Sequence, residues 1–407
     1  MSSIEEIRSE FPQLSQKVYN KPLVYLDNAA TALRPRDVIA KWDDMSSRFS
    51  ANLHRAVHAV AERATEEFED ARSAVASFIG ADSPKEIVFT SGTTHGINLL
   101  AYSLGEKKNF LGPGDEIIVS EAEHHSNILP WQFLAERKLL KIKVLPIDDN
   151  GLVKLEELPR LITERTRICS IAQVSNVLGI INPVSEIASL CHSHDILLVV
   201  DGAQGIVHCK TDVKELGADF YVFSGHKIYA APGTGVLWGK KQLLDSLPPY
   251  MGGGEMISTV KFSGSTFAPV PYKFEAGTQN IAGVPTLVPA LGWVKKLREY
   301  PETEGVKRYM LDALSQIPGL RLFGTPGKPE QKIPLFSFAV EGAHHEDLAL
   351  ILDKMGIAVR SGQMCAEPLM DRYGVTGMLR ASFAPYNTQE EAEYFIKSLQ
   401  KAIKMLK

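Results

Sequence analysis

The sequence predicts an α/β protein with a doubly wound, mostly parallel sheet of seven strands and a smaller α+β domain. Three observations lead to this prediction. From about residue 57 to 240, short apolar runs alternate with segments long enough for helices, as in successive strand–helix–strand units. After about residue 241 this alternation gives way to a loop-rich stretch with proline and glycine. Beyond residue 286, a long helical pattern, short strands and a terminal helix follow.

The predicted strands are short apolar runs bounded by polar turns. The first of them follows a helical pattern of apolar residues between residues 57 and 78. We expect strands at residues 87–90, 117–120, 142–147, 167–173, 196–200, 219–223 and 235–238, all within a large domain of residues 23–285. Residues 1–22 and 286–407 are expected to form the small domain, with strands near 319–323 and 334–340.

The composition excludes several classes of function. Lys and Arg total 44 against 48 Asp and Glu, so no broad positive field attracts nucleic acid or an anionic membrane. Residues 1–11 lack the basic start and apolar core of a signal peptide, and the apolar run at 196–200 is far too short to span a membrane. The four cysteines form no C-x-x-C pair, which argues against disulfides and against a zinc site. We therefore expect a cytoplasmic protein with no metal.

Polar residues directly follow five of the predicted strands. In an open α/β sheet, ligands bind outside the carboxyl ends of the strands, so these residues are the first candidates for a site. They occupy positions 91–94, 123–125, 175–176, 201–204 and 224–227. We expect all five segments to meet in one polar pocket.

Three of these segments suggest the chemistry of a phosphorylated cofactor. Gly92, Thr93 and Thr94 open a helix whose free N–H groups suit a phosphate, although such a turn also serves as a plain helix cap. Asp201 follows a buried strand and needs a cationic partner, either in a turn salt bridge or as a protonated pyridine nitrogen. Lys227 is either a solvated surface group or a partly desolvated amine suited to Schiff-base chemistry. The neighbouring strand-end positions of Asp201 and Lys227 favour the cofactor.

Other candidates lie in loops. His124 can stack on an aromatic cofactor ring or serve as a polar loop residue, and binding of one metal ion by two adjacent histidines is the weaker interpretation. Cys365 lies in a polar segment where its thiol can reach a substrate, and Arg360 nearby favours the thiolate, although most free cysteines only pack. Arg380 suits a substrate carboxylate or a structural salt bridge.

The order of these motifs resembles the group II cysteine desulfurases of the SUF type, which belong to the class-V aminotransferase-like enzymes of fold type I that use pyridoxal 5′-phosphate (PLP). The resemblance covers nearly the whole chain. It rests on Tyr25-Leu-Asp-Asn-Ala-Ala30, Asn52-Leu-His-Arg55, Gly92-Thr-Thr94, Glu123-His-His-Ser-Asn127, Asp201-Gly-Ala-Gln204, Ser224-Gly-His-Lys227, Phe274-Glu-Ala-Gly-Thr-Gln-Asn280, Arg360-Ser-Gly-Gln-Met-Cys365-Ala and Arg380-Ala-Ser382.

The resemblance implies how PLP is held. Lys227 would form an imine with PLP, Asp201 would pair with the pyridine nitrogen, Gln204 would contact the ring hydroxyl, and His124 would stack on the ring as a catalytic group. The phosphate would be held by Thr93, Thr94, Ser224 and His226, and by Thr278 reaching across from the second subunit of a homodimer.

The resemblance also implies the reaction. L-cysteine would become alanine while Cys365 receives its sulfur as a persulfide, for iron–sulfur cluster assembly through an acceptor protein of the SufE type. Asn176 and Arg380 would grip the substrate carboxylate, and His54, Arg55 and Arg360 would line the entrance. Residues 252–256 would belong to a latch-like hairpin that gates the site.

Some features leave alternatives open. Gln363 and Met364 precede Cys365 where relatives often have histidines, and His95 stands where an acidic residue is common. Selenocysteine lyase, cysteine sulfinate desulfinase, kynureninase and an epimerase share the lysine and the aspartate, although Cys365 disfavours the last two. A non-catalytic scaffold of a sulfur-transfer complex is a further alternative. A nicotinamide-dependent dehydrogenase is disfavoured because no G-x-G-x-x-G opens a strand–helix–strand unit.

Overall fold

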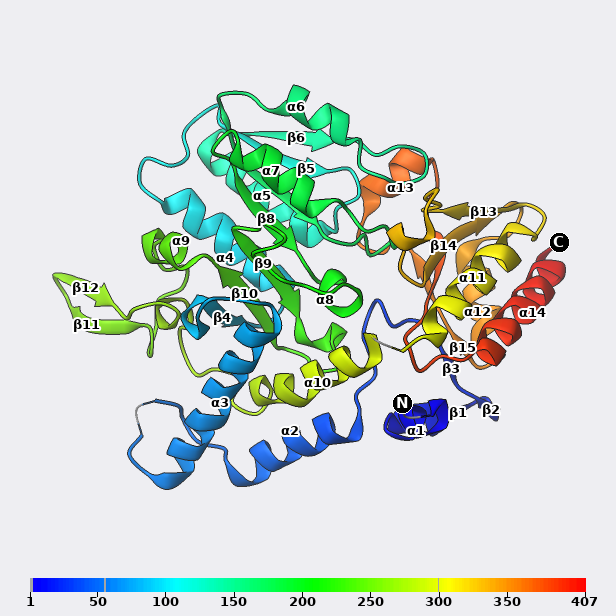
Figure 1. Ribbon diagram of the computed structural model, residues 1–407, viewed down its shortest axis with the longest axis horizontal. Helices are drawn as coiled ribbons and strands as arrows, with labels where there is room; N and C mark the ends of the chain where they lie inside the picture. Colours follow the sequence, from blue (N-terminus) through cyan, green and yellow to red (C-terminus); the bar gives the residue numbers. More distant parts are fainter. Residues whose placement is uncertain (1–2, 55, 299) are drawn as a thin grey trace.

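The computed structural model describes residues 3–54, 56–298 and 300–407. Its largest feature is a seven-stranded sheet with the order β4-β10-β9-β8-β7-β5-β6 (Figure 1). The strands are β4 (Ile87–Thr90), β5 (Glu116–Ser120), β6 (Lys141–Leu145), β7 (Thr166–Ala172), β8 (Leu197–Asp201), β9 (Phe220–Ser224) and β10 (Gly235–Gly239). Each predicted strand is present within two residues of its expected bounds. Only β10 runs antiparallel to its neighbours, so the expectation of a mostly parallel sheet is confirmed.

Helices cover both faces of this sheet, because successive side chains of each strand point to opposite faces. Ile117 packs with α4 (Thr93–Glu106) and α5 (Leu129–Lys138). Its neighbour Ile118 belongs to the core on the other face. That second core is covered by α3 (Ala59–Phe78), α7 (Val184–His192) and α10 (Leu287–Arg298). The remaining helices around the sheet are α2 (Arg36–Arg48), α6 (Leu158–Leu161), α8 (Gly205–His208) and α9 (Lys241–Ser246).

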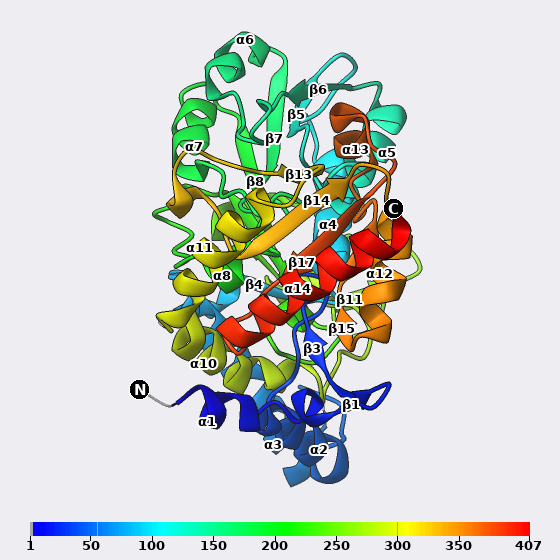
Figure 2. The ribbon, with the colours of Figure 1, turned by 90° about the vertical axis from the view of Figure 1, so that its right-hand side faces the viewer.

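A second, smaller sheet has the order β13-β14-β17-β16 and is antiparallel throughout. Its strands are β13 (Leu320–Phe323), β14 (Leu335–Val340), β16 (Arg360–Gly362) and β17 (Met378–Ser382). The first two match the predicted strands, and the other two lie outside the expected ranges. Figure 2 shows α11 (Glu302–Ser315), α12 (His345–Lys354) and α14 (Gln389–Leu406) over this sheet, while α13 (Glu367–Tyr373) lies at the junction of the two units.

The predicted domain boundaries at residues 22/23 and 285/286 stay a prediction, and the packing of the first segment and of α10 bears on where the two units divide. The first segment comprises α1 (Ile4–Ser9), β1 (Lys17–Val18), β2 (Lys21–Pro22) and β3 (Val24–Tyr25), and β3 pairs with β15 (Ile357–Ala358). Val24 belongs to the core of the small sheet, whereas Phe11 belongs to the core of the large one. Helix α10 also packs in the core of the large sheet. We therefore propose that the large unit extends to about residue 300 and that β3 belongs to the small unit.

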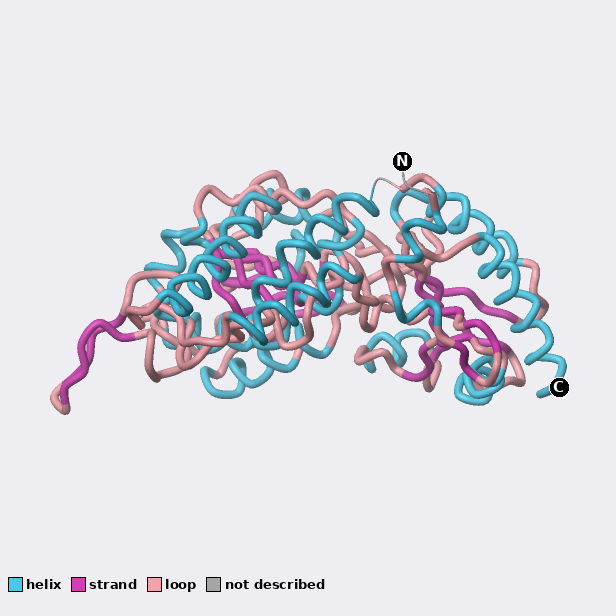
Figure 3. Tube along the Cα trace, turned by 90° about the horizontal axis from the view of Figure 1, so that it is seen from below, coloured by secondary structure: helices cyan, strands magenta, loops and turns pink. Residues whose placement is uncertain are grey.

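A two-stranded hairpin, β11 (Ile257–Lys261) and β12 (Gly264–Phe267), projects from the large unit (Figures 1 and 3). The side chains of Val260 and Phe262 are fully or largely exposed. Residues 252–256, expected within the hairpin, instead form the loop that leads into it. Among the described residues, no helix is both long enough and apolar enough to cross a membrane.

One buried lysine joins the two units. Ile180 and Lys332 form an isolated β-bridge, and the Lys332 amine donates a 2.5 Å hydrogen bond to the carbonyl of Leu178. Burial, with a smaller contribution from the charge of Lys307, lowers the pKa of Lys332 to about 7. The junction therefore holds a lysine that loses its charge near neutral pH.

Candidate active site

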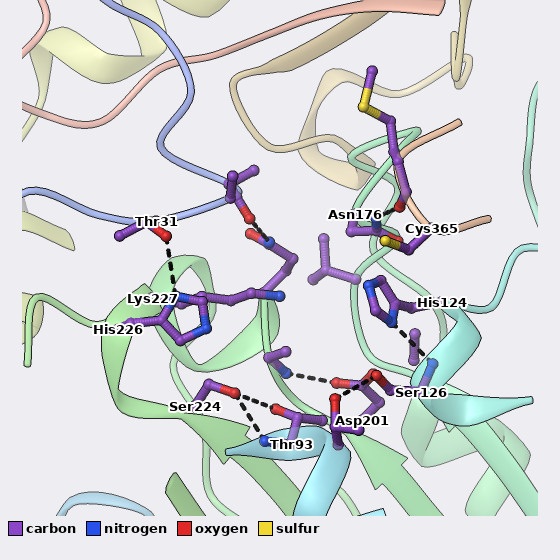
Figure 4. A pocket seen from close by; sticks show the side chains of 18 of the residues that line it. Thr31, Thr93, His124, Ser126, Asn176, Asp201, Ser224, His226, Lys227 and Cys365 are labelled. Atoms are coloured by element: carbon purple, nitrogen blue, oxygen red, sulfur yellow. Dashed lines mark hydrogen bonds between the residues drawn. The ribbon is translucent and has the colours of Figure 1, made fainter. Parts of the chain in front are cut away.

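A cavity of about 330 Å³ lies at the carboxyl ends of the central strands, where the small unit meets the large sheet (Figure 4). All five predicted strand-end segments contribute to its lining. The predicted site residues in this lining are Thr93, Thr94, His124, Asn176, Asp201, Gln204, Ser224, His226, Lys227, Arg360, Cys365 and Arg380.

Two predicted residues, His54 and Thr278, are not part of the cavity lining, and a third lies outside the part of the chain that the structure describes. His54 contacts Glu69 at 3.5 Å and packs its ring against Tyr272, outside the described lining. Thr278 is exposed, and its predicted contact from a second subunit stays a prediction, because a single chain does not test it. Arg55 lies outside the described residues.

The half-buried Lys227 and the buried Asp201 lie in the floor of the cavity. Asp201 is the last residue of β8, and Lys227 ends the short turn after the neighbouring strand β9. Burial lowers the pKa of Lys227, and the charge of Asp201 opposes this shift. Burial raises the pKa of Asp201, which Lys227 and the backbone N–H of Ala203 oppose. The pair thus places an amine that is easily neutralised beside a carboxylate that needs a cation.

The first turn of α4 forms a cradle of hydroxyl groups. The backbone N–H of Thr93 donates to the hydroxyl of Ser224 at 2.8 Å, and the Thr93 hydroxyl contacts the same oxygen at 2.8 Å. The hydroxyl of Thr94 lies 2.6 Å from that of Ser126. Gly235 allows the contact of Thr93 at the start of α4 with Ser224 at the end of β9, because a Cβ at this position would collide with the backbone of Gly92. The start of a helix surrounded by hydroxyls suits an anion such as phosphate.

His124 faces the cavity as a neutral imidazole. Its Nδ1 accepts a 3.0 Å hydrogen bond from the backbone N–H of Ser126, so its proton lies on Nε2. Burial, followed by the charge of Lys227, lowers the pKa of His124 to about 3. Figure 4 shows the ring between Cys365 and the floor of the cavity.

The turn that carries His124 is held by the buried Glu123. Its carboxyl group accepts hydrogen bonds from the Ser120 hydroxyl at 2.5 Å, the Asn127 amide at 2.7 Å and the Ala172 backbone N–H at 2.9 Å. Burial raises the pKa of Glu123 to about 7, because these hydrogen bonds only partly offset the loss of water. Glu123 therefore ties the His124 turn to strand β7.

Two arginines lie at the side of the small unit. Arg380 donates to the Asn176 carbonyl at 2.8 Å and pairs with Asp27 at 3.1 Å. Arg360 lies 3.7 Å from the other oxygen of Asp27. The Nε of Arg380 is buried and has no hydrogen-bond partner among the described residues. This arrangement leaves a donor for an additional anion.

The comparisons with known proteins agree with this geometry. Residues 24–395 match the family model described as aminotransferase class-V. This chain belongs to the class-V aminotransferase family. A probable cysteine desulfurase of Vibrio cholerae is 44% identical over 409 residues that cover 100% of both chains. The crystal structure of the Escherichia coli cysteine desulfurase CsdA in an S-sulfonic acid form superposes with a TM-score of 0.91, at 40% identity and 100% coverage of both chains.

A third relative extends the comparison. The apo structure of a cysteine desulfurase from Thermococcus onnurineus NA1 covers 100% of this chain and 99% of its own, with a TM-score of 0.93 and 34% identity. The predicted fold type I of the PLP-dependent transferases is thereby confirmed. The prediction of an enzyme homologous to cysteine desulfurases is confirmed as well.

As a class-V aminotransferase homologue, the chain has a donor set that fits PLP. The cavity combines a half-buried amine at Lys227, a buried carboxylate at Asp201, the hydroxyl cradle and the unpartnered Nε of Arg380. A ring with a basic nitrogen, an aldehyde and a phosphate would satisfy these groups. His226 and Gln204 are less available to a cofactor, because each already has a hydrogen-bond partner in the chain. Nδ1 of His226 contacts the Thr31 hydroxyl at 3.2 Å, and the Gln204 amide donates to the carbonyl of Ala29 at 2.7 Å.

Cys365 is the exposed cysteine of this class-V aminotransferase homologue, whereas Cys169 and Cys191 are buried and Cys209 is half-buried. It lies in the turn between β16 and α13, where Met364 and Cys365 adopt positive φ values of 54° and 56°. The Asn176 amide donates to the Met364 carbonyl at 2.8 Å. The thiol therefore enters the cavity from a turn that the large unit holds.

Sequence reasoning gave no separate role to Asp27, Thr31, Ser126 and Glu123. Asp27 lies in the motif Tyr25-Leu-Asp-Asn-Ala-Ala30, but its partner Arg380 is 353 residues away in the chain. Glu123 directly precedes His124. Its position shortly after a buried strand is the sequence feature that could have indicated its role.

Proposed function

We propose that this protein is a PLP-dependent cysteine desulfurase that transfers the sulfur of L-cysteine to Cys365. One observation carries the proposal: the half-buried amine of Lys227 and the exposed thiol of Cys365 line the same cavity. The amine suits an amino-acid substrate with a carbonyl cofactor, and the thiol suits sulfur transfer. Similarity to cysteine desulfurases over the full length supports the same activity.

Lys227 would hold PLP through its amine, Asp201 would pair with the ring nitrogen, and Thr93, Thr94, Ser224 and His226 would hold the phosphate. Gln204 would contact the ring hydroxyl and His124 would stack on the ring. When bound, PLP supplies an electron sink that makes the Cα proton of an amino acid acidic. Burial lowers the pKa of Lys227, which favours a free amine that can take up that proton.

Arg380 and Asn176 would orient the substrate through its carboxylate, with Arg360 nearer the entrance. Arg380 suits this role because it is buried and has an unpartnered Nε, and a guanidinium binds a carboxylate through two parallel hydrogen bonds. His124 keeps an N–H at Nε2 toward the cavity and can donate a hydrogen bond from it to the substrate.

The sulfur step balances without an external oxidant. The Cys365 thiolate attacks the sulfur of the substrate, the bond between that sulfur and Cβ breaks, and Cβ gains a proton. Cysteine thus leaves as alanine, while the transferred sulfur remains on Cys365 as a persulfide. Because Cys365 is exposed, a sulfur acceptor can reach it.

We further propose that the protein works as a homodimer of the group II type. Phe262 and Val260 are largely exposed on the projecting hairpin, and a second subunit is the cover that such apolar side chains favour. Thr278 would then complete the phosphate site of the partner, and His54 and Arg55 would lie near its entrance.

A protein of the SufE type would take the sulfur for iron–sulfur cluster assembly. Four free cysteines suit the reducing cytoplasm.

The test compares Lys227→Ala, Cys365→Ser and the control Cys209→Ser, which removes another accessible thiol. Purified proteins would be loaded with PLP, and their absorbance spectra, alanine release and persulfide on residue 365 would be measured with L-cysteine. We expect Lys227→Ala to lose the lysine-linked absorbance band. Cys365→Ser should keep that band but lose turnover, and Cys209→Ser should behave as the wild type.

Two results would contradict the proposal. If Cys365→Ser releases alanine from L-cysteine at the wild-type rate, a lyase acting on selenocysteine or cysteine sulfinate becomes the better candidate. If the wild type takes up no PLP, the proposed PLP-dependent desulfurase activity is wrong, and a non-catalytic scaffold role gains support.

A further inference from the structure

His125, the residue after His124, points away from the cavity and toward the turn that carries Cys365. Its backbone N–H donates a 2.7 Å hydrogen bond to the carbonyl of Cys365. Its Nε2 accepts a 3.1 Å hydrogen bond from the backbone N–H of Glu367. The Glu367 carboxylate lies 3.9 Å from the same nitrogen. One residue of the large unit thus contacts the Cys365 turn at the cysteine itself and again two residues after it.

The hydrogen bond from the Glu367 N–H to His125 does the work of a side-chain N-cap for helix α13. Glu367 is the first residue of α13, and its N-cap residue Ala366 has no side chain that can accept a hydrogen bond. The imidazole of His125 fills this role from the other unit. Because α13 begins two residues after Cys365, this bond fixes where the turn ends.

The turn requires such support. Met364 and Cys365 both adopt left-handed backbone conformations, which residues with a side chain rarely occupy. The Asn176 amide holds the carbonyl of Met364, and His125 holds the carbonyl of Cys365. Two loops of the large unit therefore maintain a conformation that the turn would not favour alone.

We propose that His125 is the positioning residue of Cys365, and that the turn 124–127 sets both sides of the reaction. His124 faces the cavity from this turn, while His125 holds the nucleophile loop. A displacement of the turn would move the imidazole at the cofactor side and the thiol at the substrate side together. The role in sulfur transfer rests on the proposed function, whereas the restraint of the loop does not.

The experiment uses the PLP-loaded protein and three variants. His125→Ala removes the acceptor for Glu367, and His125→Gln places an amide oxygen near the same position. His344→Ala is the matched control, because His344 accepts a 3.3 Å hydrogen bond from Glu346 at the start of α12. Hydrogen exchange of a peptide covering residues 363–370, the absorbance of bound PLP and single-turnover persulfide formation on Cys365 would be measured.

In His125→Ala we expect exchange of the 363–370 peptide to become about fivefold faster, as for the loss of one helix cap. Persulfide formation should slow by about tenfold with an unchanged absorbance, since a small misplacement of a reacting group is costly. His125→Gln should return both quantities to within about twofold of the wild type, as expected for a retained cap. His344→Ala should alter neither.

Equal exchange of this peptide in His125→Ala and His344→Ala would overturn the proposal, as would a failure of His125→Gln to restore persulfide formation. If exchange accelerates in His125→Ala while the wild type forms no persulfide from L-cysteine, the restraint of the loop stands and the proposed function fails.

Discussion

Arg360 and Arg380 lie directly opposite each other on the neighbouring strands β16 and β17. Like charges in such a pair destabilise a sheet, and the carboxylate of Asp27 offsets the repulsion by approaching both guanidinium groups. The two arginines lie on the wall of the cavity. This wall therefore retains a capacity for a second carboxylate.

The first prediction concerns Arg380. In Arg380→Lys we expect the KM for L-cysteine to rise about tenfold, because an ammonium lacks the planar pair of donors that fits a carboxylate. Steady-state alanine release would measure it. Arg321→Lys is the control, since Arg321 lies on β13 and donates to the carbonyl of Tyr373. Equal KM values in the two variants would mean that the substrate carboxylate is held elsewhere.

The second prediction separates two roles of His124. His124→Ala should lower the single-turnover rate of alanine formation by about 100-fold or more, the range for loss of one preorganised hydrogen-bond donor. His124→Phe keeps an aromatic ring for stacking but has no N–H to donate a hydrogen bond. We expect His124→Phe to bind PLP more tightly than His124→Ala and to be equally slow. A fast Phe variant would assign His124 to stacking alone.

The third prediction follows from the pKa of Glu123, which is about 7 in the folded protein against an ordinary value of 4.5. The folded state then holds a proton that the unfolded state has released. The free energy of unfolding should therefore fall as the pH rises from 4.5 through 7, by about 3 kcal/mol. Glu123→Gln should lack this fall, and urea unfolding at several pH values would measure it. Parallel pH dependence in the two proteins would refute the assignment.

The fourth prediction has the opposite sign. Lys332 has a pKa of about 7 when folded and an ordinary value of 10.5, so the unfolded state binds its proton more tightly. The free energy of unfolding should rise between pH 7 and pH 10 by up to about 1.4 kcal/mol per pH unit. Lys332→Met should lose this slope, and the exposed control Lys401→Met should keep it. The prediction fails if Lys332→Met and Lys401→Met show the same slope.

Most strands of the large sheet could be predicted because they are compact apolar runs buried on both faces, although the edge strand β6 is only partly buried. Their order could not, since nothing within the run 235–238 indicates that β10 enters between β4 and β9 in the opposite direction. The hairpin at Ile257–Lys261 and Gly264–Phe267 was missed for a different reason. Its side chains are mostly exposed, so no buried face leaves an alternating pattern in the sequence.

Much of the cavity lining could be predicted as well, because the carboxyl ends of parallel strands share one edge of a sheet. The residues that join distant parts of the chain could not. Asp27 and Arg380 are 353 residues apart, and His125 and Glu367 are 242 residues apart. These contacts depend on how the small unit docks, which no local pattern records.

The contact of Thr93 with Ser224 depends on the missing side chain of Gly235. Strands β4 and β9 are not neighbours, because β10 lies between them, and Gly235 is paired with Thr90 on one side and Ser224 on the other. Because Gly235 has no Cβ, Thr93 can reach Ser224 past the intervening strand β10. The start of α4, which suits an anion, and the turn that presents Lys227 are therefore joined by a direct hydrogen bond, which fixes the distance between them.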